Sequence, residues 1–545
     1  MGGTAGDNEI TSPCPIGSDS SGAGIFLLQK EVLWMHLPMK KSSGQNPDTK
    51  LFQERKENMI KPDCETTRKL AKTYSVIPVY QEFLGDVLTP IAILKKLAEN
   101  SSRYYLLESV EGGKTWGRYS FLGCDPLMRI TCRDCEVTIE RNGKKEIKRT
   151  ETPLEVLRNI LKEYKAPVMP ELPPFTGGMV GYFAYSMIGY EEPVLKIKKG
   201  GFADYDVMLF DKVIAYDHLR QKLFLIANIN TDNVIENYGK AAKEIERLAA
   251  MLKKEGDGKS VVEKEKICFQ CSTSKEEYCR MVEKTKEYIR NGDIFQAVIS
   301  RQFHAKTKNS LLPAYRILRT TNPSPYMVYF HTEDEELMST SPETLVRLNH
   351  ERLATFPVAG SRPRGATKEE DDARKTELLS DEKELAEHDM LVDLGRNDLG
   401  KISKFGSVEV TKYKEIHQYS KIMHICSQVE GEIDDGKDAL DAIASVLPAG
   451  TLSGAPKIRA CQIIEKLEKE ERGIYGGAIG YLDFTGNMDT CIAIRMAVKK
   501  GDTVYVQAGG GIVADSVPEM EYEESANKAA AVIQAVVEAG EAEEL

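Results

Sequence analysis

Two short segments, Gly177-Gly-Met-Val-Gly-Tyr182 and Gly476-Gly-Ala-Ile-Gly-Tyr481, read almost alike although they lie in different halves of the chain. In each segment, glycines interrupt a strand-like run of residues. Such glycines indicate a bulge or the close approach of another backbone. The likeness predicts two halves of related build around one cleft.

Composition restricts the class of protein. The 545 residues carry 73 basic and 84 acidic side chains, a formal net charge of −11 with the two signs interspersed. A nucleic-acid partner would require a concentrated basic patch, so we expect none. No apolar run approaches the roughly 18 residues of a membrane span, and we expect neither a membrane segment nor a secretory signal. Eleven scattered cysteines do not form a disulfide framework, which favours a reducing cytoplasm.

Shifts in composition divide the chain into four parts. Residues 1–58 are polar or rich in Gly, Ser and Thr, and we predict a disordered N-terminal extension there. Patterned sequence over 59–254 predicts a first domain, the charged stretch 255–266 a linker, and 267–541 a second domain. Capping signals predict helices that begin after Thr89, Thr152 and Ser274.

Two Cys-x-x-Cys pairs, Cys132/Cys135 and Cys268/Cys271, raise the alternative of a zinc site. The first lies in residues 129–140, which alternate like one strand and run into a hairpin turn at Asn142-Gly143. More than 130 residues separate the two pairs, far beyond the spacing of zinc ribbons. We interpret all four as ordinary thiols.

Two acidic pairs, Glu384/Glu387 and Glu521/Glu524, each fall in a stretch that reads as helix. A separation of three residues places both carboxylates of a pair on one helical face, and Lys528 extends the second stripe. Four converging carboxylates without a Cys or His partner would suit a hard cation such as Mg²⁺. The alternative is that both pairs are solvated helix faces.

Other residues indicate an anionic substrate. The run Ala508-Gly509-Gly510-Gly511 offers bare backbone amides to an anion, and a glycine-rich loop at 448–457 leads into a helix. Arg495 ends an otherwise apolar strand-like run and would need a partner such as a substrate carboxylate.

His388 is interpreted as a structural histidine, and His424 either as a core histidine or as a base.

From about residue 70 to the C-terminus, the order of motifs resembles the chorismate-utilising enzymes, and most closely the component I family of the anthranilate synthases. The matching segments are residues 106–109, 117–120, 322–327, 339–343, 357–364, 384–397, 447–457, 475–480, 509–513 and 518–528. The resemblance implies an α/β (α+β) fold of two intertwined domains, with β-sheets packed face to face and helices outside.

The resemblance also implies a ligand set. In the family pattern Glu387 and Glu524 bind Mg²⁺ directly, Glu384 and Glu521 support them, and the ion holds the ring carboxylate of chorismate. The positions that match substrate contacts are Gly360, Ser361, Tyr475, Arg495, Gly509, Gly510, Gly511 and Lys528. The family more often has Thr at the position of Ser361, a departure that keeps the hydroxyl.

The resemblance implies a lyase reaction in two steps, the first committed step of tryptophan biosynthesis. Ammonia adds at C2 of chorismate while Glu343 protonates the departing C4 hydroxyl, with Thr451 bonding near the substrate. His424 then removes the C2 proton and pyruvate leaves, which gives anthranilate. Sister enzymes that make aminodeoxychorismate, or isochorismate and salicylate, carry a Lys where this chain has Ala359 or Gln296, so amination is favoured over these alternatives.

Regulation and partners follow from the same resemblance. Residues that match a pocket for the feedback inhibitor L-tryptophan are Glu108, Ser109, Asn322, Pro325, Tyr326 and Met327. The alternative is that this motif only packs the domain interface. No cysteine has a Gly-x-Cys-x-Gly setting, so we expect a separate glutamine amidotransferase subunit, component II, in a heterotetramer. A non-enzymatic amino-acid sensor and a metal-dependent phosphoester hydrolase are disfavoured alternatives.

Overall fold

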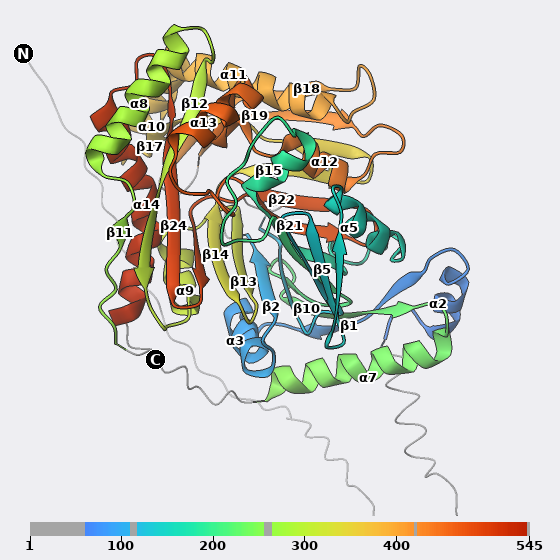
Figure 1. Ribbon diagram of the computed structural model, residues 1–545. Helices are drawn as coiled ribbons and strands as arrows, with labels where there is room; N and C mark the ends of the chain where they lie inside the picture. The colour runs from blue at the N-terminus through green and yellow to red at the C-terminus, as the bar shows by residue number, and fades with distance from the viewer. Residues whose placement is uncertain (1–59, 110–116, 255–263, 419–421, 542–545) are drawn as a thin grey trace, which may run out of the picture. The chain divides into compact units, whose positions relative to one another are not determined.

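The computed structural model describes residues 60–109, 117–254, 264–418 and 422–541. The predicted extension at 1–58 lies outside the described residues, as does most of the predicted linker at 255–266. The described residues belong to one compact unit, Glu54–Leu545. It contains both strands and helices, with several runs of consecutive strands along the chain (Figure 1).

Two antiparallel sheets form the centre of this unit. The first sheet contains, in spatial order, β1 (Val76–Leu84), β10 (Lys222–Asn230), β9 (Lys212–Asp217), β3 (Tyr119–Cys124), β2 (Tyr104–Glu108), β13 (Tyr326–His331), β14 (Glu335–Ser341), β23 (Met496–Lys500), β24 (Thr503–Ile512), β12 (Gln296–Lys306) and β11 (Gln270–Cys271), with β20 (Gly454–Ala455) beside β12. The second contains β17 (Val358–Pro363), β19 (Ile422–Glu432), β16 (Arg352–Thr355), β15 (Thr344–Asn349), β22 (Met488–Ile492), β21 (Ala478–Asp483), β7 (Gly178–Phe183), β8 (Tyr205–Phe210), β4 (Met128–Arg133), β5 (Glu136–Arg141) and β6 (Lys144–Arg149), with β18 (Glu409–Gln418) beside β19.

Each sheet is built around a central pair of strands, and the strands on one side of this pair correspond in order to those on the other. In the first sheet β2 pairs with β13, and β3, β9, β10 and β1 on one side correspond to β14, β23, β24 and β12 on the other. In the second sheet β7 pairs with β21, so that Gly181 lies opposite Gly480. A Cβ on either glycine would lie 2.0 or 2.1 Å from a backbone oxygen of the next strand. The predicted internal repeat is therefore confirmed, together with its close backbone contacts.

Helices cover the outer face of each sheet (Figure 1). The helices are α2 (Cys64–Leu70), α3 (Pro90–Asn100), α5 (Pro153–Lys162), α6 (Ile188–Glu191), α7 (Val234–Lys253), α8 (Lys275–Arg290), α9 (Leu312–Thr321), α10 (Lys368–Ser380), α11 (Glu382–Gly400), α12 (Ala439–Val446), α13 (Lys457–Leu467) and α14 (Pro518–Glu541), with short 3₁₀ turns η1 (Tyr185–Met187) and η2 (Gly450–Leu452).

Three apolar clusters define the layers. One packs α3, α7, α9 and α14 on the first sheet, a second packs α5, α11 and α12 on the second sheet, and a third fills the space between the sheets. Because each sheet takes strands from both halves of the chain, the halves are intertwined. The predicted arrangement, sheets face to face with helices outside, is confirmed.

Capping chemistry explains several helix starts. Thr89 accepts the Ala92 amide at the start of α3, and Ser274 with Glu277 forms a complete capping box on α8. Such caps satisfy amides that have no partner within the helix. At α5 the proline after Thr152 is present, but the Thr152 side chain makes no cap. That helix begins where predicted without the expected hydrogen bond.

Three local predictions are wrong. Residues 129–140 are not one strand but two, β4 and β5, joined by a tight turn in which Asp134 and Cys135 have φ of 53° and 65°. The sequence Arg396-Asn397-Asp398, after the first acidic pair, predicts a turn, but these residues are helical, since α11 continues to Gly400. Arg495 lies outside the strand, after β22 has ended at Ile492.

Candidate active site

In the second half, the chain crosses between the sheets at two neighbouring places. Residues 342–343 connect β14 of the first sheet to β15 of the second, and residues 493–495 connect β22 back to β23. The Ile492 amide donates to the Glu343 carbonyl at 3.0 Å, and the Thr340 amide donates to the Arg495 carbonyl at 3.1 Å. These bonds hold the two crossovers side by side. Glu343 and Arg495, predicted from distant motifs, therefore meet at one site.

Glu343 has the environment of a neutral acid. Burial raises the pKa of its carboxyl above the ordinary 4.5, against opposing effects of the Thr451 hydrogen bond and of Arg495 and Lys528. The Thr451 hydroxyl in η2 donates to Glu343 Oε2 at 3.0 Å. A desolvated carboxyl held by one hydroxyl can retain its proton closer to neutral pH and deliver it to a leaving oxygen.

His424 is oriented as a base would be. It lies in β19 opposite Ser361 of β17, and its Nδ1 is 3.0 Å from the Gly360 carbonyl and 3.1 Å from the Ser361 hydroxyl. Because a carbonyl oxygen only accepts, Nδ1 carries the hydrogen and Nε2 carries the lone pair of the neutral ring. Burial lowers the pKa of His424 below the ordinary 6.5, against the opposing effect of the Gly360 hydrogen bond and with a smaller contribution from Arg495, which favours the neutral ring.

Gly360 makes this orientation possible. It has φ of +67° and lies at a register shift between β17 and β19. A Cβ at this position would contact Leu378 at 3.0 Å and Glu384 Oε2 at 3.2 Å. A bulged glycine thus directs its carbonyl at the histidine and leaves room for the acidic helix α11.

The two acidic pairs, on α11 and α14, influence one another's charge. Burial raises the pKa of Glu387 above its ordinary value, and Glu384 and Glu524 raise it further. Burial and Glu524 likewise raise the pKa of Glu521. Like charges act on one another in this way only when they are close, so the two helices present their carboxylates to one region.

This acidic group fits a hard cation. Its donors are carboxylate oxygens only, the ligands that Mg²⁺ prefers. In the observed conformation Arg362 contacts Glu384 at 3.3 Å and Lys528 contacts Glu524 at 2.8 Å. Among the described residues, no group of three or more His, Cys, Asp or Glu side chains is arranged so that it could hold a metal ion. Glu387 and Glu521, which make neither of these ion pairs, keep carboxylate oxygens for an ion.

Hydrogen bonds fix the helices that carry these pairs. His388 of α11 bonds the Ser427 hydroxyl of β19 at 2.6 Å, which confirms that it is a structural histidine. Arg301 of β12 donates to Ser525 Oγ at 3.0 Å and to the Tyr522 carbonyl at 2.8 Å, both in α14. The acidic side chains therefore stand on anchored helices rather than on loops.

The glycine run is a strand rather than a loop. Gly509, Gly510 and Gly511 lie in β24, which pairs with β12 over this stretch but with β23 only as far as Val506. A Cβ on Gly510 would lie 2.8 Å from Glu521 Oε2, and one on Gly511 would lie 2.1 Å from Gln296 Nε2. These positions must be glycine because a side chain there would clash with the acidic helix α14 or with Gln296.

Tyr475 and Gln296 line the same region. Tyr475 is buried, and burial raises the pKa of its hydroxyl, with the Gly509 backbone among the smaller opposing effects. Gln296 is 4% exposed, and its Oε1 has no hydrogen-bond partner among the described residues. An unpaired buried acceptor costs about 1–3 kcal/mol, so its position indicates a ligand that donates a hydrogen bond. Lys528 Nζ also reaches the Gly509 carbonyl, at 3.2 Å.

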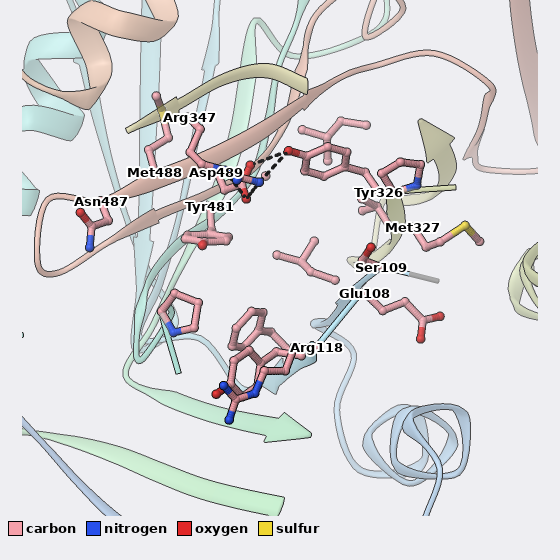
Figure 2. Close-up of a pocket in the computed structure, with 18 of the residues that line it drawn as sticks. Glu108, Ser109, Arg118, Tyr326, Met327, Arg347, Tyr481, Asn487, Met488 and Asp489 are labelled. Carbon is pink, nitrogen blue, oxygen red and sulfur yellow. Dashed lines mark hydrogen bonds and ion pairs between the residues drawn. The ribbon is translucent and has the colours of Figure 1, made fainter. Parts of the chain in front are cut away.

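A second pocket, of about 230 Å³, collects most of the residues matched to the inhibitor site. Glu108, Ser109, Pro325, Tyr326 and Met327 line it, together with residues of β21 and β22. Figure 2 shows the Tyr326 ring directed toward Asp489 and Arg347. The pocket lies where β2 meets β13, at the centre of the first sheet.

Two members of the predicted inhibitor set have other partners. The Glu108 carboxylate pairs with Arg319 at 2.6 Å and accepts the Tyr315 hydroxyl, so it is engaged by α9. Asn322 does not line the pocket, and its side chain donates to the Thr340 hydroxyl at 3.2 Å. The pocket wall otherwise matches the predicted set.

Two functional candidates were missed by sequence reasoning. Thr344, next to Glu343, bonds the Tyr326 hydroxyl at 2.9 Å and so connects the second pocket to the acid. Arg472 lies buried behind Tyr475, its guanidinium 5.8 Å from the ring centroid. A threonine after a known motif and an arginine within a charged run carry no pattern that would have revealed either role.

The first of the two Cys-x-x-Cys pairs consists of free thiols with raised pKa values. All cysteines in the described ranges are free, and burial raises the pKa of both Cys132 and Cys135. Raised thiol pKa values mark unreactive cysteines. Across the part of the chain that the structure describes, no helix is both long and apolar enough to cross a bilayer.

Known proteins share this fold and sequence. The structure of anthranilate synthase component I from Streptococcus pneumoniae superposes with a TM-score of 0.69 at 36% identity, covering 82% of this chain and 98% of that one. The menaquinone-specific isochorismate synthase MenF of Escherichia coli, at 17% identity and a TM-score of 0.65, covers 87% of this chain and 98% of its own, and shares the fold alone. The class defined by fold and site is that of the chorismate-utilising enzymes.

The sequence comparisons are more specific. A family model described as chorismate binding enzyme matches residues 104–534. Anthranilate synthase component 1 of Acetivibrio thermocellus is 46% identical over 495 residues, which cover 89% of this chain and 100% of that protein. The Aquifex aeolicus protein of the same name is 46% identical over 486 residues, covering 88% and 98%. The chain belongs to the chorismate-binding enzyme family, in the group of the anthranilate synthase component 1 proteins.

Proposed function

We propose that this chain converts chorismate and ammonia into anthranilate and pyruvate, the first committed step of tryptophan biosynthesis. The observation that carries the proposal is the convergence of Glu343, His424 and Arg495 with two acidic pairs at the crossovers between the sheets. An acid, a base, a guanidinium and a cation site are what a dianionic substrate losing water and pyruvate requires. The relatives named anthranilate synthase component 1 support the same reaction.

We assign Mg²⁺ to the acidic pairs. Glu387 and Glu524 would bind the ion and Glu384 and Glu521 would support it, since all four carboxylates face one region. A bound ion would neutralise and hold a carboxylate of the substrate. Lys528 would then exchange its ion pair with Glu524 for the substrate.

The substrate carboxylate that the ion does not hold would be bound by hydrogen-bond donors of this chain. Arg495 supplies a guanidinium, and its φ of +46° turns it out of the strand at the crossover. Tyr475 and the glycine amides of β24 add neutral donors on the open side of that strand. Fixed dipoles and a bidentate cation bind a carboxylate without reorganisation.

The first step uses Glu343 as the acid. Its proton passes to the C4 hydroxyl, which departs as water while ammonia forms a bond at C2, and the resulting ammonium group then releases a proton to solvent. Arg495 and Lys528 lower the pKa of Glu343 in the substrate-free chain. Substrate carboxylates would neutralise both cations, which raises this pKa further and keeps the acid protonated when it is needed.

The second step uses His424 as the base. Nε2 takes the proton from C2, the bond between the ring and the enolpyruvyl oxygen breaks, and pyruvate leaves after its methylene carbon gains a proton. The hydrogen bond from Nδ1 to the Gly360 carbonyl holds the required tautomer and stabilises the charged ring that results.

Two neutral residues favour ammonia over other nucleophiles. Ala359 provides no amine to attack C2, and the unpaired Gln296 Oε1 can accept a hydrogen bond from ammonia. Ammonia is nucleophilic without a base, whereas water would need one. The sister reactions that form aminodeoxychorismate, isochorismate or salicylate are thereby disfavoured.

We assign L-tryptophan to the second pocket as a feedback inhibitor. Tyr326 donates to Asp489 at 2.8 Å and bonds Thr344, whose neighbour is Glu343. A ligand that moves Tyr326 would thus displace the acid. A coupling of about 1–3 kcal/mol between the sites would change chorismate affinity roughly 5–150-fold.

We further propose a glutamine amidotransferase subunit as the source of ammonia, in a heterotetramer that works in the cytoplasm. The name component 1 of the relatives supports a second component. The free cysteines of the described ranges support a reducing compartment.

The test is product identification. The purified chain is incubated with chorismate, MgCl₂ and an ammonium salt at alkaline pH, and the products are separated and quantified. Anthranilate and pyruvate in equal amounts are expected. Isochorismate, salicylate, or an amino product that keeps its pyruvyl arm would overturn the proposal.

A further inference from the structure

A buried ion pair lies directly behind the candidate active site. Glu468 follows α13, and Arg472 follows it by one helical turn's spacing; their side chains are 5% and 1% exposed. The contact is bidentate, with Arg472 Nε 2.9 Å from Glu468 Oε2 and Nη2 2.7 Å from Oε1. The planar guanidinium is suited to such fixed geometry.

The guanidinium also binds two backbone carbonyls. Nη1 donates to the Leu452 carbonyl at 2.5 Å, and Nη2 donates to the Val298 carbonyl at 2.7 Å. Leu452 belongs to η2 and directly follows Thr451, whose hydroxyl holds Glu343. Arg472 therefore fixes the turn that positions the acid against strand β12.

The same group supports the substrate side of the site. The Arg472 carbonyl accepts the Tyr475 amide at 3.1 Å, and its guanidinium lies near the Tyr475 ring. Glu468 Oε1 accepts the Ser300 amide at 2.7 Å and its hydroxyl at 2.9 Å. Ser300 of β12 is paired with Gly509. One ion pair thus touches three structures that surround the predicted substrate.

We propose that Arg472, fixed by Glu468, is a positioning residue that sets Thr451 and Tyr475 for the reaction. The inference rests on the proposed function, because it assigns these two contacts a catalytic consequence. The alternative is that the pair only stabilises the fold. A buried ion pair is weak evidence for stability, since apolar residues of similar volume often replace such pairs without loss.

That property supplies the test. The double variant Arg472→Met/Glu468→Leu removes both charges together and leaves neither uncompensated. The matched control is Arg129→Met/Asp206→Leu, another buried bidentate pair with side chains 7% and 1% exposed, which joins β4 to β8 away from the site. The single variant Arg472→Lys keeps a charge but cannot bind Glu468 and both carbonyls as one fork.

Thermal unfolding, kcat and KM for chorismate are measured for each chain, and chorismate binding is titrated without ammonium. We expect both double variants to fold. The Arg129 control should keep its kcat within about threefold. The Arg472 double variant should lose about 100-fold in kcat, since a misplacement of about 1 Å in a reacting group costs that much. Its KM should rise and its chorismate affinity fall by a smaller factor than kcat, because Tyr475 supplies one neutral donor beside the charged groups that bind the substrate, and Arg472→Lys should not restore kcat.

Several results would overturn the inference. One is a kcat of the Arg472 double variant within about threefold of wild type. Another is an equally large loss of kcat in the Arg129 control. The third is a failure of both Arg472 variants to fold while the control folds. Wild-type chain that forms no anthranilate would instead refute the proposed function. The two failures are therefore distinguishable.

Discussion

Replacing Glu343 by Gln isolates the proton from the geometry. Thr451 donates to Glu343 Oε2 at 3.0 Å, and the amide oxygen of Gln can accept the same bond, so the crossover should keep its shape. Only the acidic proton is lost. Loss of a general acid costs about 10²–10⁴-fold in rate, or roughly 2.7–5.4 kcal/mol of barrier.

Thr451→Val gives the comparison. It removes one hydrogen bond worth about 0.5–1.5 kcal/mol and leaves the proton in place, which predicts a kcat roughly 2- to 13-fold lower. Because the Thr451 bond lowers the pKa of Glu343, its removal should raise that pKa. The two variants therefore separate protonation from positioning.

The assay follows anthranilate formation against pH, with total ammonium adjusted to keep the ammonia concentration constant. Glu343 acts when protonated, so wild-type kcat should fall as pH rises through its pKa, which burial places above 4.5. This fall should move to higher pH in Thr451→Val and disappear in Glu343→Gln. A Gln variant with kcat within about threefold of wild type would refute the role of Glu343.

Four other variants test the remaining assignments. His424→Ala should still add ammonia but accumulate the amino intermediate, detected by chromatography. Unchanged anthranilate formation would favour the alternative that His424 is a core histidine. Glu387→Ala should fold, judged by circular dichroism, yet lose activity. Chelation of Mg²⁺ by EDTA should abolish the activity of the wild-type chain. Full activity in either case would contradict the metal assignment. Ser109→Leu should fill the second pocket and abolish inhibition while sparing uninhibited turnover. Thr344→Val should still bind tryptophan, measured by calorimetry, but weaken its inhibition; unaltered inhibition would exclude the Tyr326 connection.

The sequence predicted elements whose patterns are local. The acidic pairs at a spacing of three residues identified faces of α11 and α14, and the repeated glycine segments identified β7 and β21. Helix period and strand alternation are properties of neighbouring residues, so they can be read without knowledge of the fold. The family resemblance then supplied the sheet arrangement that these patterns alone did not.

Long-range partners could not be predicted in the same way. Residues 129–140 alternate throughout, yet the chain reverses at Asp134 and Cys135, because β4 and β5 pair with one another. Arg472 and Glu468 sit in a charged run that resembles a solvated segment, yet both are buried and bond β12 and η2. Burial depends on what the fold places opposite a residue, which no local pattern contains.

The repeat explains why the site occurs in the second half. The first half has corresponding crossovers, at residues 125–127 between β3 and β4 and at Asp211 between β8 and β9. Where the second half places Arg495, the first places Asp211, whose carboxylate pairs with Lys212 at 2.9 Å. An acidic side chain there would repel a substrate carboxylate rather than bind it.

The helices differ in the same sense. Both α7 and α14 follow the last strand of their half, and at the fourth and seventh positions α14 carries Glu521 and Glu524. At those positions α7 carries Asn237 and Lys240, and Lys240 pairs with Glu236 on an exposed face. A hard cation needs several carboxylate oxygens, which α7 does not offer there. The repeat therefore supplies the backbone geometry twice, whereas the charges that we assign to a dianionic substrate and its cation stand on the second copy.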